Sequence, residues 1–154
     1  IGSEILFCEI EIEANVEPAK INQDPTFHFN VSLDKKIYNS GDKMLIEINT
    51  SKNMYMTIFQ FLPYGGTDYA KVTKIFPNKN KTDNLVTKNL KLNGNVSFPD
   101  KINQETVDEY LFFVASEKNI PWLDEYSQFE SLKSQISKSN FLMEKHYVGY
   151  IVTK

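Results

Sequence analysis

The chain has 154 residues, a length typical of one domain with its own hydrophobic core, and its formal net charge at pH 7 is −3. All seventeen basic residues are lysine, so arginine is missing for bidentate contacts to phosphate or guanine, and the composition argues against nucleic-acid binding. The single cysteine, Cys8, excludes an internal disulfide and a cysteine-rich zinc site, and no apolar stretch approaches the roughly 20 residues of a membrane-spanning helix.

Alternation of apolar and polar residues predicts β-strands in the N-terminal part of the chain. Residues 4–13 alternate apolar side chains with glutamates, which is typical of a strand with one buried face. Residues 26–33 alternate in the same way, with phenylalanine, valine and leucine inward and His28 outward. After a turn at residues 38–43, residues 44–49 continue the pattern as a further strand.

A glycine pair, Gly65 and Gly66, lies between two predicted strands and is either a ligand-binding loop or a bend. The strand before it, residues 54–62, is apolar on both faces and is expected to be central and covered on each side. A phosphate-binding loop needs Lys-Ser/Thr after the glycines and then a helix. Here a strand at residues 70–76 follows instead, so we expect a hairpin turn.

Further strands are predicted in the C-terminal half of the chain. Residues 84–92 and 95–98 are expected to be short strands, and residues 100–110 a polar loop. Residues 110–116 are again apolar on both faces, and residues 146–153 predict a final strand.

One amphipathic helix is predicted over residues 121–138. Apolar side chains recur at helical spacing on one face of it: Trp122, Tyr126, Phe129, Leu132 and Ile136. With about eight strands and this helix, the sequence predicts one mainly β domain over residues 1–154. We expect an antiparallel β-sandwich, immunoglobulin-like or similar, with the C-terminal helix packed on one face or edge.

An ordered set of short motifs runs through the middle of the chain. The residues that carry it are Gly41, Asp42, Tyr55, Ile75, Phe76, Pro77, Asn78, Phe98, Pro99, Ala115 and Ser116. This set resembles the bacterial domain-of-unknown-function family 4384 over residues 38–117, and the strands at 4–13 and 146–153 and the helix at 121–138 are then additions. The resemblance implies a β-rich accessory module, attached to protein kinases, caspase-like peptidases or envelope proteins. It favours a periplasmic or cell-envelope location over a cytoplasmic one, and it supplies no catalytic residues.

The motif residues also have structural explanations. Gly41 and Asp42 form a turn in which the aspartate accepts hydrogen bonds from nearby backbone N–H groups. Pro77 and Asn78 end a strand, because proline cannot continue the hydrogen-bond ladder. Phe76, just before them, is expected to be a core aromatic residue.

Candidate catalytic and metal-binding residues are few. Cys8 shares the apolar phase of its strand and is expected to be a small core residue, rather than a nucleophile with His28 or His146 as its base. The two histidines are far apart in the sequence and belong to no metal-binding spacing, so we expect surface histidines, no metal and no cofactor. A thiol or carboxylate hydrolase is a remote alternative.

We therefore expect a non-catalytic interaction module that binds a partner protein or another part of its parent chain. The loop around the glycine pair carries Tyr64, Asp68 and Tyr69, which we predict to form the core of the interaction patch. The alternative is a carbohydrate-binding module that stacks sugars on the same two tyrosines. Trp122 is expected to pack in the core with the helix rather than to bind a ligand.

Overall fold

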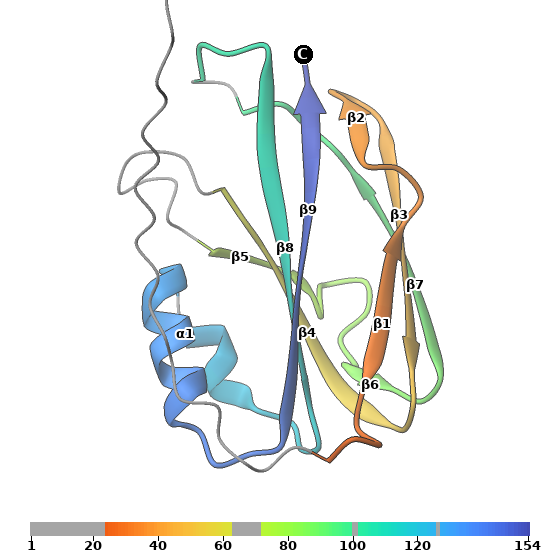
Figure 1. Ribbon diagram of the computed structural model, residues 1–154, viewed down its shortest axis with the longest axis vertical. Helices are drawn as coiled ribbons and strands as arrows, with labels where there is room; N and C mark the ends of the chain where they lie inside the picture. The colour runs from red at the N-terminus through yellow and green to blue at the C-terminus, as the bar shows by residue number, and fades with distance from the viewer. Residues whose placement is uncertain (1–23, 63–71, 100–101, 126) are drawn as a thin grey trace, which may run out of the picture.

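A computed structural model shows the fold of the chain (Figure 1). The residues that it describes are 24–62, 72–99, 102–125 and 127–154. The predicted strand at residues 4–13, with Cys8, and the predicted turn at Gly65 and Gly66 lie outside these residues.

The described residues form nine β-strands in two sheets and one α-helix near the C-terminus, which confirms the predicted mainly β fold. The smaller sheet has the strand order β1–β3–β7, and the larger has the order β2–β9–β8–β4–β5, with β6 paired to β4. The strands are β1 Phe29–Leu33, β2 Ile37–Asn39, β3 Lys43–Thr50, β4 Met54–Phe61, β5 Val72–Phe76, β6 Leu85–Val86, β7 Asn89–Asn95, β8 Thr106–Ser116 and β9 Met143–Thr153.

The strand order is that of an immunoglobulin-like sandwich. Strands β1, β3 and β7 take the positions of strands A, B and E, and β4, β8 and β9 those of C, F and G. Strand β5 extends the larger sheet beyond β4, as in variable-type domains. The chain changes sheets between β1 and β2, and Ile37 of β2 pairs with Ile151 of β9 in parallel. The other strand pairs of the described residues are antiparallel, as predicted.

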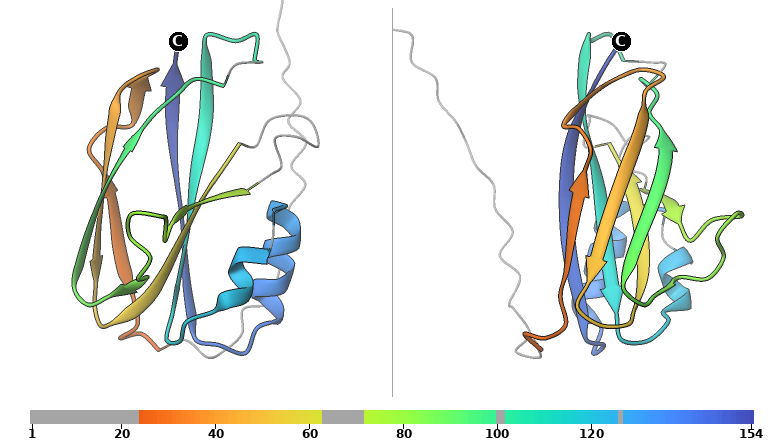
Figure 2. Two further views of the ribbon diagram at one scale, coloured as in Figure 1. Left: turned by 180° about the vertical axis from the view of Figure 1, so that it is seen from behind. Right: turned by 90° about the vertical axis from the view of Figure 1, so that its right-hand side faces the viewer.

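Two apolar cores lie on opposite faces of the larger sheet, and Figures 1 and 2 show the smaller sheet on one side of it and the helix on the other. The core between the sheets includes Phe29, Ile46, Met56, Leu111 and Phe113. The core under the helix includes Phe59, Phe112, Val114, Leu132 and Ile136. Strands β4 and β8 therefore bury both faces, as their continuous apolar pattern predicted.

Two strands are longer in the structure than the sequence predicted. Strand β8 begins at Thr106, inside the predicted polar loop of residues 100–110, because Thr106 pairs with Thr153 at the far end of β9. Strand β9 begins at Met143 rather than at residue 146. Polar residues hid both extensions, and the long pairing between β8 and β9 holds them in the sheet.

The predicted strand at residues 84–92 is two strands in different sheets, since β6 pairs with β4 and β7 pairs with β3. Beyond β7, the predicted strand at residues 95–98 is wrong. Val96 instead exchanges backbone hydrogen bonds of 2.9 Å with Gly41 and Asp42 in the turn before β3. Strand β2 was not predicted, because its three residues carry too little pattern to separate them from a turn.

The predicted single helix is also wrong at its start. A 3₁₀ turn, η1, covers Pro121–Glu125, and the helix α1 covers Phe129–Lys138. Between them Gln128 has extended backbone angles, and the backbone N–H of Val72 in β5 donates to the carbonyl of Ser127 at 2.9 Å. A contact with a distant strand therefore interrupts a pattern that is helical locally.

The predicted docking face of the helix is largely as expected. Leu132 and Ile136 are buried under the larger sheet, and Trp122 and Phe129 are partly buried against the same core. Tyr126, the fifth residue of the predicted stripe, lies outside the described residues.

Candidate functional site

A pocket of about 250 Å³ lies between the two sheets, on the side where β5 and β7 form their edges. Strands β3 and β7 of the smaller sheet and β4, β5, β8 and β9 of the larger sheet line it. Its apolar lining includes Met44, Ile46, Ile75, Leu92 and Leu111. Gln60 and Tyr150 are the polar residues that the larger sheet contributes to it.

Behind these two polar side chains lies a buried carboxylate. Glu109 is 2% exposed, and full burial is rare for an acidic side chain. Its Oε2 accepts hydrogen bonds from the hydroxyl of Tyr150 at 2.5 Å and from Nε2 of Gln60 at 2.8 Å. The same Gln60 nitrogen donates to the Tyr150 hydroxyl oxygen at 3.0 Å. The three side chains form one cluster, named the polar cluster below.

The strand register explains how the polar cluster assembles. Glu109 of β8 and Tyr150 of β9 are direct cross-strand partners, and both point into the sandwich with Leu111 and Val152. Gln60 of β4 pairs with Leu111, so it reaches Glu109 diagonally across the sheet. Burial, followed by the hydrogen bond to Glu109, raises the pKa of Tyr150 well above its usual range. Its hydroxyl therefore stays protonated and remains a hydrogen-bond donor at neutral pH.

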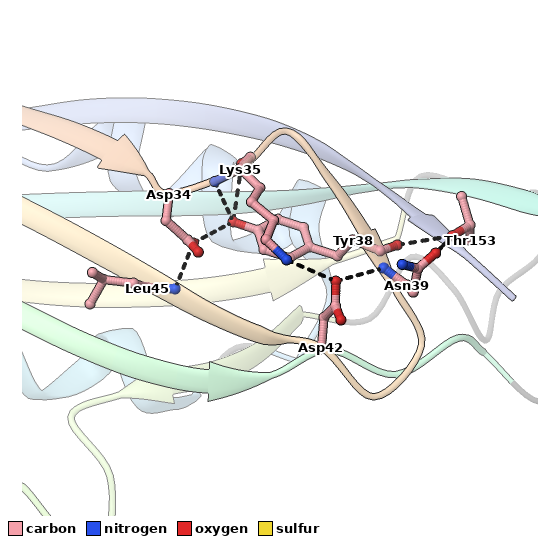
Figure 3. A network of polar contacts seen from close by, with 7 residues as sticks. All are labelled: Asp34, Lys35, Tyr38, Asn39, Asp42, Leu45 and Thr153. Atoms are coloured by element: carbon pink, nitrogen blue, oxygen red, sulfur yellow. Dashed lines mark hydrogen bonds and ion pairs between the residues drawn. The ribbon is translucent and has the colours of Figure 1, made fainter.

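A second polar network surrounds Tyr38, at the point where the chain changes sheets (Figure 3). The Tyr38 hydroxyl lies 2.9 Å from Oδ1 of Asp34 and 3.0 Å from the Lys35 carbonyl oxygen, and it accepts from the Lys35 N–H at 3.2 Å. Asp34 also accepts from the backbone N–H of Leu45 in β3 at 2.8 Å. Burial, with the hydrogen bond to Asp34, raises the pKa of Tyr38 to about 12. This network bonds mainly backbone groups, so we assign it to the fold.

Gly41 and Asp42 belong to the same turn. Gly41 has a φ of 97°, a conformation that favours glycine. Oδ2 of Asp42 accepts from the backbone N–H of Asn39 and from Nζ of Lys35, both at 3.1 Å, and these bonds lower the pKa of Asp42. The predicted hydrogen bonding of Asp42 to nearby backbone is confirmed. Thr153, at the end of β9, donates to the Asn39 side chain at 2.7 Å and so holds β2 in place.

The Phe-Pro-Asn segment also has a structural role. Phe76 is fully buried in the core between the sheets, and Pro77 follows the last residue of β5. Oδ1 of Asn78 accepts from the backbone N–H groups of Asn80 and Lys81 at 3.0 and 3.1 Å, which closes a turn after the strand. Tyr55 is half-buried on β4.

The outer face of the larger sheet carries a layer of aromatic rings beside the helix. The rings of Phe61 and Phe129 stack at 4.1 Å, those of Phe112 and Tyr147 at 4.6 Å, and those of Phe61 and Tyr110 at 5.4 Å. Tyr147 is 49% exposed. We name these five residues the aromatic layer.

The other predicted site residues separate into two groups. Tyr64, Asp68 and Tyr69 lie outside the described residues. His28 is exposed just before β1, with its Nδ1 3.3 Å from the Pro25 carbonyl oxygen. His146 stacks on Phe29, with 4.3 Å between the ring centroids. In the part of the chain that the structure describes, no three histidine, cysteine or acidic side chains gather as a metal site would need.

The polar cluster was missed at the sequence level. Its signal was Glu109, an acidic residue at an apolar phase, two positions from Val107 and from Leu111. That signal appears only when β8 is extended back to Thr106, whereas the sequence pattern placed Glu109 in a loop.

The chain has no match among protein-family models, curated proteins or solved structures. Within the described ranges, no helix is long and apolar enough to cross a membrane. The function is therefore argued from the geometry of the pocket and of the faces around it.

Proposed function

We propose that the protein is a non-catalytic interaction module that recognises its partner through the pocket between the sheets. The observation that carries this proposal is the pocket itself, about 250 Å³ in volume. Its lining combines apolar side chains with Gln60 and Tyr150 of the polar cluster and with asparagines from β7 and from the turn after β5. Apolar walls with a few convergent polar groups are typical of binding sites, where the walls supply affinity and the polar groups fix orientation.

The bonding within the polar cluster favours recognition over catalysis. Tyr150 is held protonated by burial and by its bond to Glu109, so it is a poor base and a poor nucleophile at neutral pH. The carboxylate of Glu109 faces two hydrogen-bond donors of the protein rather than open solvent. A fixed, internally bonded cluster of this kind is suited to orienting a bound group.

The resemblance of residues 38–117 to the domain-of-unknown-function family 4384 supports an accessory role, and membership of that family remains part of the proposal. An immunoglobulin-like sandwich is a common scaffold for interaction modules, but a scaffold alone does not specify what is bound.

Filling the pocket tests the proposal. In Leu92→Trp a larger side chain on β7 occupies the pocket, whereas Leu85→Trp makes the same change on β6, where Leu85 is 38% exposed and outside the pocket lining. A partner captured from the source cell is purified, and its affinity for both variants is measured by calorimetry. We expect Leu92→Trp to bind at least tenfold more weakly and Leu85→Trp to bind as the wild type does. Equal affinities would show that the partner binds elsewhere.

Carbohydrate binding is a second candidate function, and the aromatic layer favours it. Gly149 of β9 lies opposite Tyr110 of β8. A Cβ at Gly149 would come within 3.1 Å of the Tyr110 ring, which shows that the Tyr110 ring lies close against β9. Tyr147 is 49% exposed and is the ring of this layer on which a sugar could stack, whereas its neighbour Phe112 is buried. A glycan array separates the two functions: carbohydrate recognition requires a signal that Tyr147→Ala abolishes, and an array without a signal would contradict it.

A further inference from the structure

Behind the pocket lies a carboxyl group that only neutral groups contact. Both hydrogen bonds of Glu109 come from uncharged side chains and are donated to one oxygen, Oε2. Among the described residues no lysine or histidine forms an ion pair with Glu109. A cation close to a buried carboxyl group favours its charged form, so a ligand that carries a cation is complementary to the site.

The orientation of Gln60 adds an acceptor at the pocket wall. Because a carboxylate offers only acceptors, the amide NH₂ of Gln60 must face Glu109, and both of its contacts are made by Nε2. Its Oε1 is then left as a hydrogen-bond acceptor that no other described residue occupies. An acceptor that lines the pocket, backed by a carboxylate, is suited to a ligand group that donates hydrogen bonds and carries positive charge.

The apolar walls set the size of the rest of the ligand. A cavity of about 150 Å³ lined by aliphatic side chains is known to hold a benzene molecule, which has six heavy atoms. The pocket here, at about 250 Å³, accommodates an apolar stem of similar size together with a polar head group. Met44, Ile46 and Leu92 would contact that stem.

We propose that the pocket binds a primary ammonium group on a short apolar stem, with the ammonium against Gln60 and Tyr150 and in the field of Glu109. The same chemistry is found in a free alkylamine and in the lysine side chain of a partner protein. This inference rests on the proposed function, because it names the chemical class that the pocket recognises.

Two matched probes test the charge of the ligand on the wild-type protein. n-Pentylammonium and 1-pentanol share the same stem and differ in the head group. Each is titrated at pH 7 while the methyl signals of Met44, Ile46 and Leu92 are followed by ¹H–¹³C NMR. We expect both to shift these signals, with n-pentylammonium binding at least tenfold more tightly than the alcohol.

A pair of variants tests the role of Glu109. Glu109→Gln removes the buried carboxyl group and keeps the shape, whereas Glu105→Gln makes the same substitution at a side chain that is 88% exposed. We expect Glu109→Gln to bind the two probes with affinities within twofold of each other, and Glu105→Gln to keep the wild-type preference. If Glu109→Gln does not fold, the wild-type comparison of the two probes still decides the proposal.

Each outcome bears on a different claim. Equal affinity of the wild type for both probes would overturn the ammonium proposal and leave the pocket as a binding site. Failure of both probes to shift the pocket methyl signals would overturn the pocket itself, and with it the proposed function. Nα-acetyl-lysine N-methylamide distinguishes the two sources: binding as tight as that of n-pentylammonium supports a lysine of a partner protein, and much weaker binding supports a free amine.

Discussion

Phe76→Ala is expected to be among the most destabilising single substitutions in the chain. Phe76 is fully buried in the core between the sheets. At about 25 cal/mol per Å² of apolar surface, full burial of a phenylalanine side chain contributes about 1.5–3 kcal/mol. The cavity that remains adds to this loss, so we expect a decrease of about 3–5 kcal/mol in the free energy of unfolding.

Urea denaturation at 25 °C measures this loss, and Phe141→Ala is the matched control. Phe141 is also a phenylalanine, but it is 41% exposed in the connection between α1 and β9, so its truncation leaves no closed cavity. We expect the control to lose less than about 1 kcal/mol. For a domain of this size, the melting temperature of Phe76→Ala should fall by roughly 6–20 °C. If the two variants lost similar amounts, Phe76 would not belong to the core.

Three further predictions concern local features. The pKa of Tyr38 is raised to about 12 from its ordinary value of 10.0, so the stability that this residue contributes is complete below pH 10 and is lost as the pH rises from 10 to 12. Urea denaturation at a series of pH values should show this decrease for the wild type and not for Tyr38→Phe. Trp122 is partly buried against the core under the helix, so its native fluorescence should be blue-shifted, and an emission maximum like that of tryptophan in water would contradict this packing. Gly41→Ala should cost about 1 kcal/mol because of the positive φ there, whereas Gly94→Ala, with open space at its Cβ and no positive φ, should cost less by thermal denaturation.

Much of the fold was predictable because its strands carry strong local patterns. The two-faced apolar runs of β4 and β8 predicted central strands, and both are covered by the smaller sheet on one side and the helix on the other. The alternation around Phe27 and Phe29 predicted their burial correctly. Where a long apolar pattern is present, local sequence and tertiary packing favour the same structure.

The errors occurred where a distant contact decides the structure. Strand β2 exists because three residues pair in parallel with β9, more than one hundred positions later. The helix begins at Phe129 because the carbonyl of Ser127 is bonded to β5. The polar cluster joins three strands, so no window of sequence contains it. Local periodicity carries no information about such pairings.

The two polar networks differ in what they hold, and that difference can be tested. The network around Tyr38 bonds the backbone of Lys35 and, through Asp34, that of Leu45, so it fixes the path of the chain. The hydrogen bonds of the polar cluster, in contrast, join only the side chains of Gln60, Glu109 and Tyr150 to one another. A buried polar cluster that bonds no backbone group is a poor source of stability, and its replacement by apolar residues of similar volume is often neutral or stabilising.

We therefore expect the triple variant Gln60→Leu/Glu109→Leu/Tyr150→Phe to unfold in urea at a free energy equal to that of the wild type or higher by up to about 4 kcal/mol. Glu109→Leu alone is the control. It leaves the donors of Gln60 and Tyr150 without their acceptor and should cost about 1–3 kcal/mol. The triple variant should also lose the preference for n-pentylammonium over 1-pentanol. A triple variant that is less stable than Glu109→Leu would show that the polar cluster serves the fold, and the argument that it is kept for binding would fail.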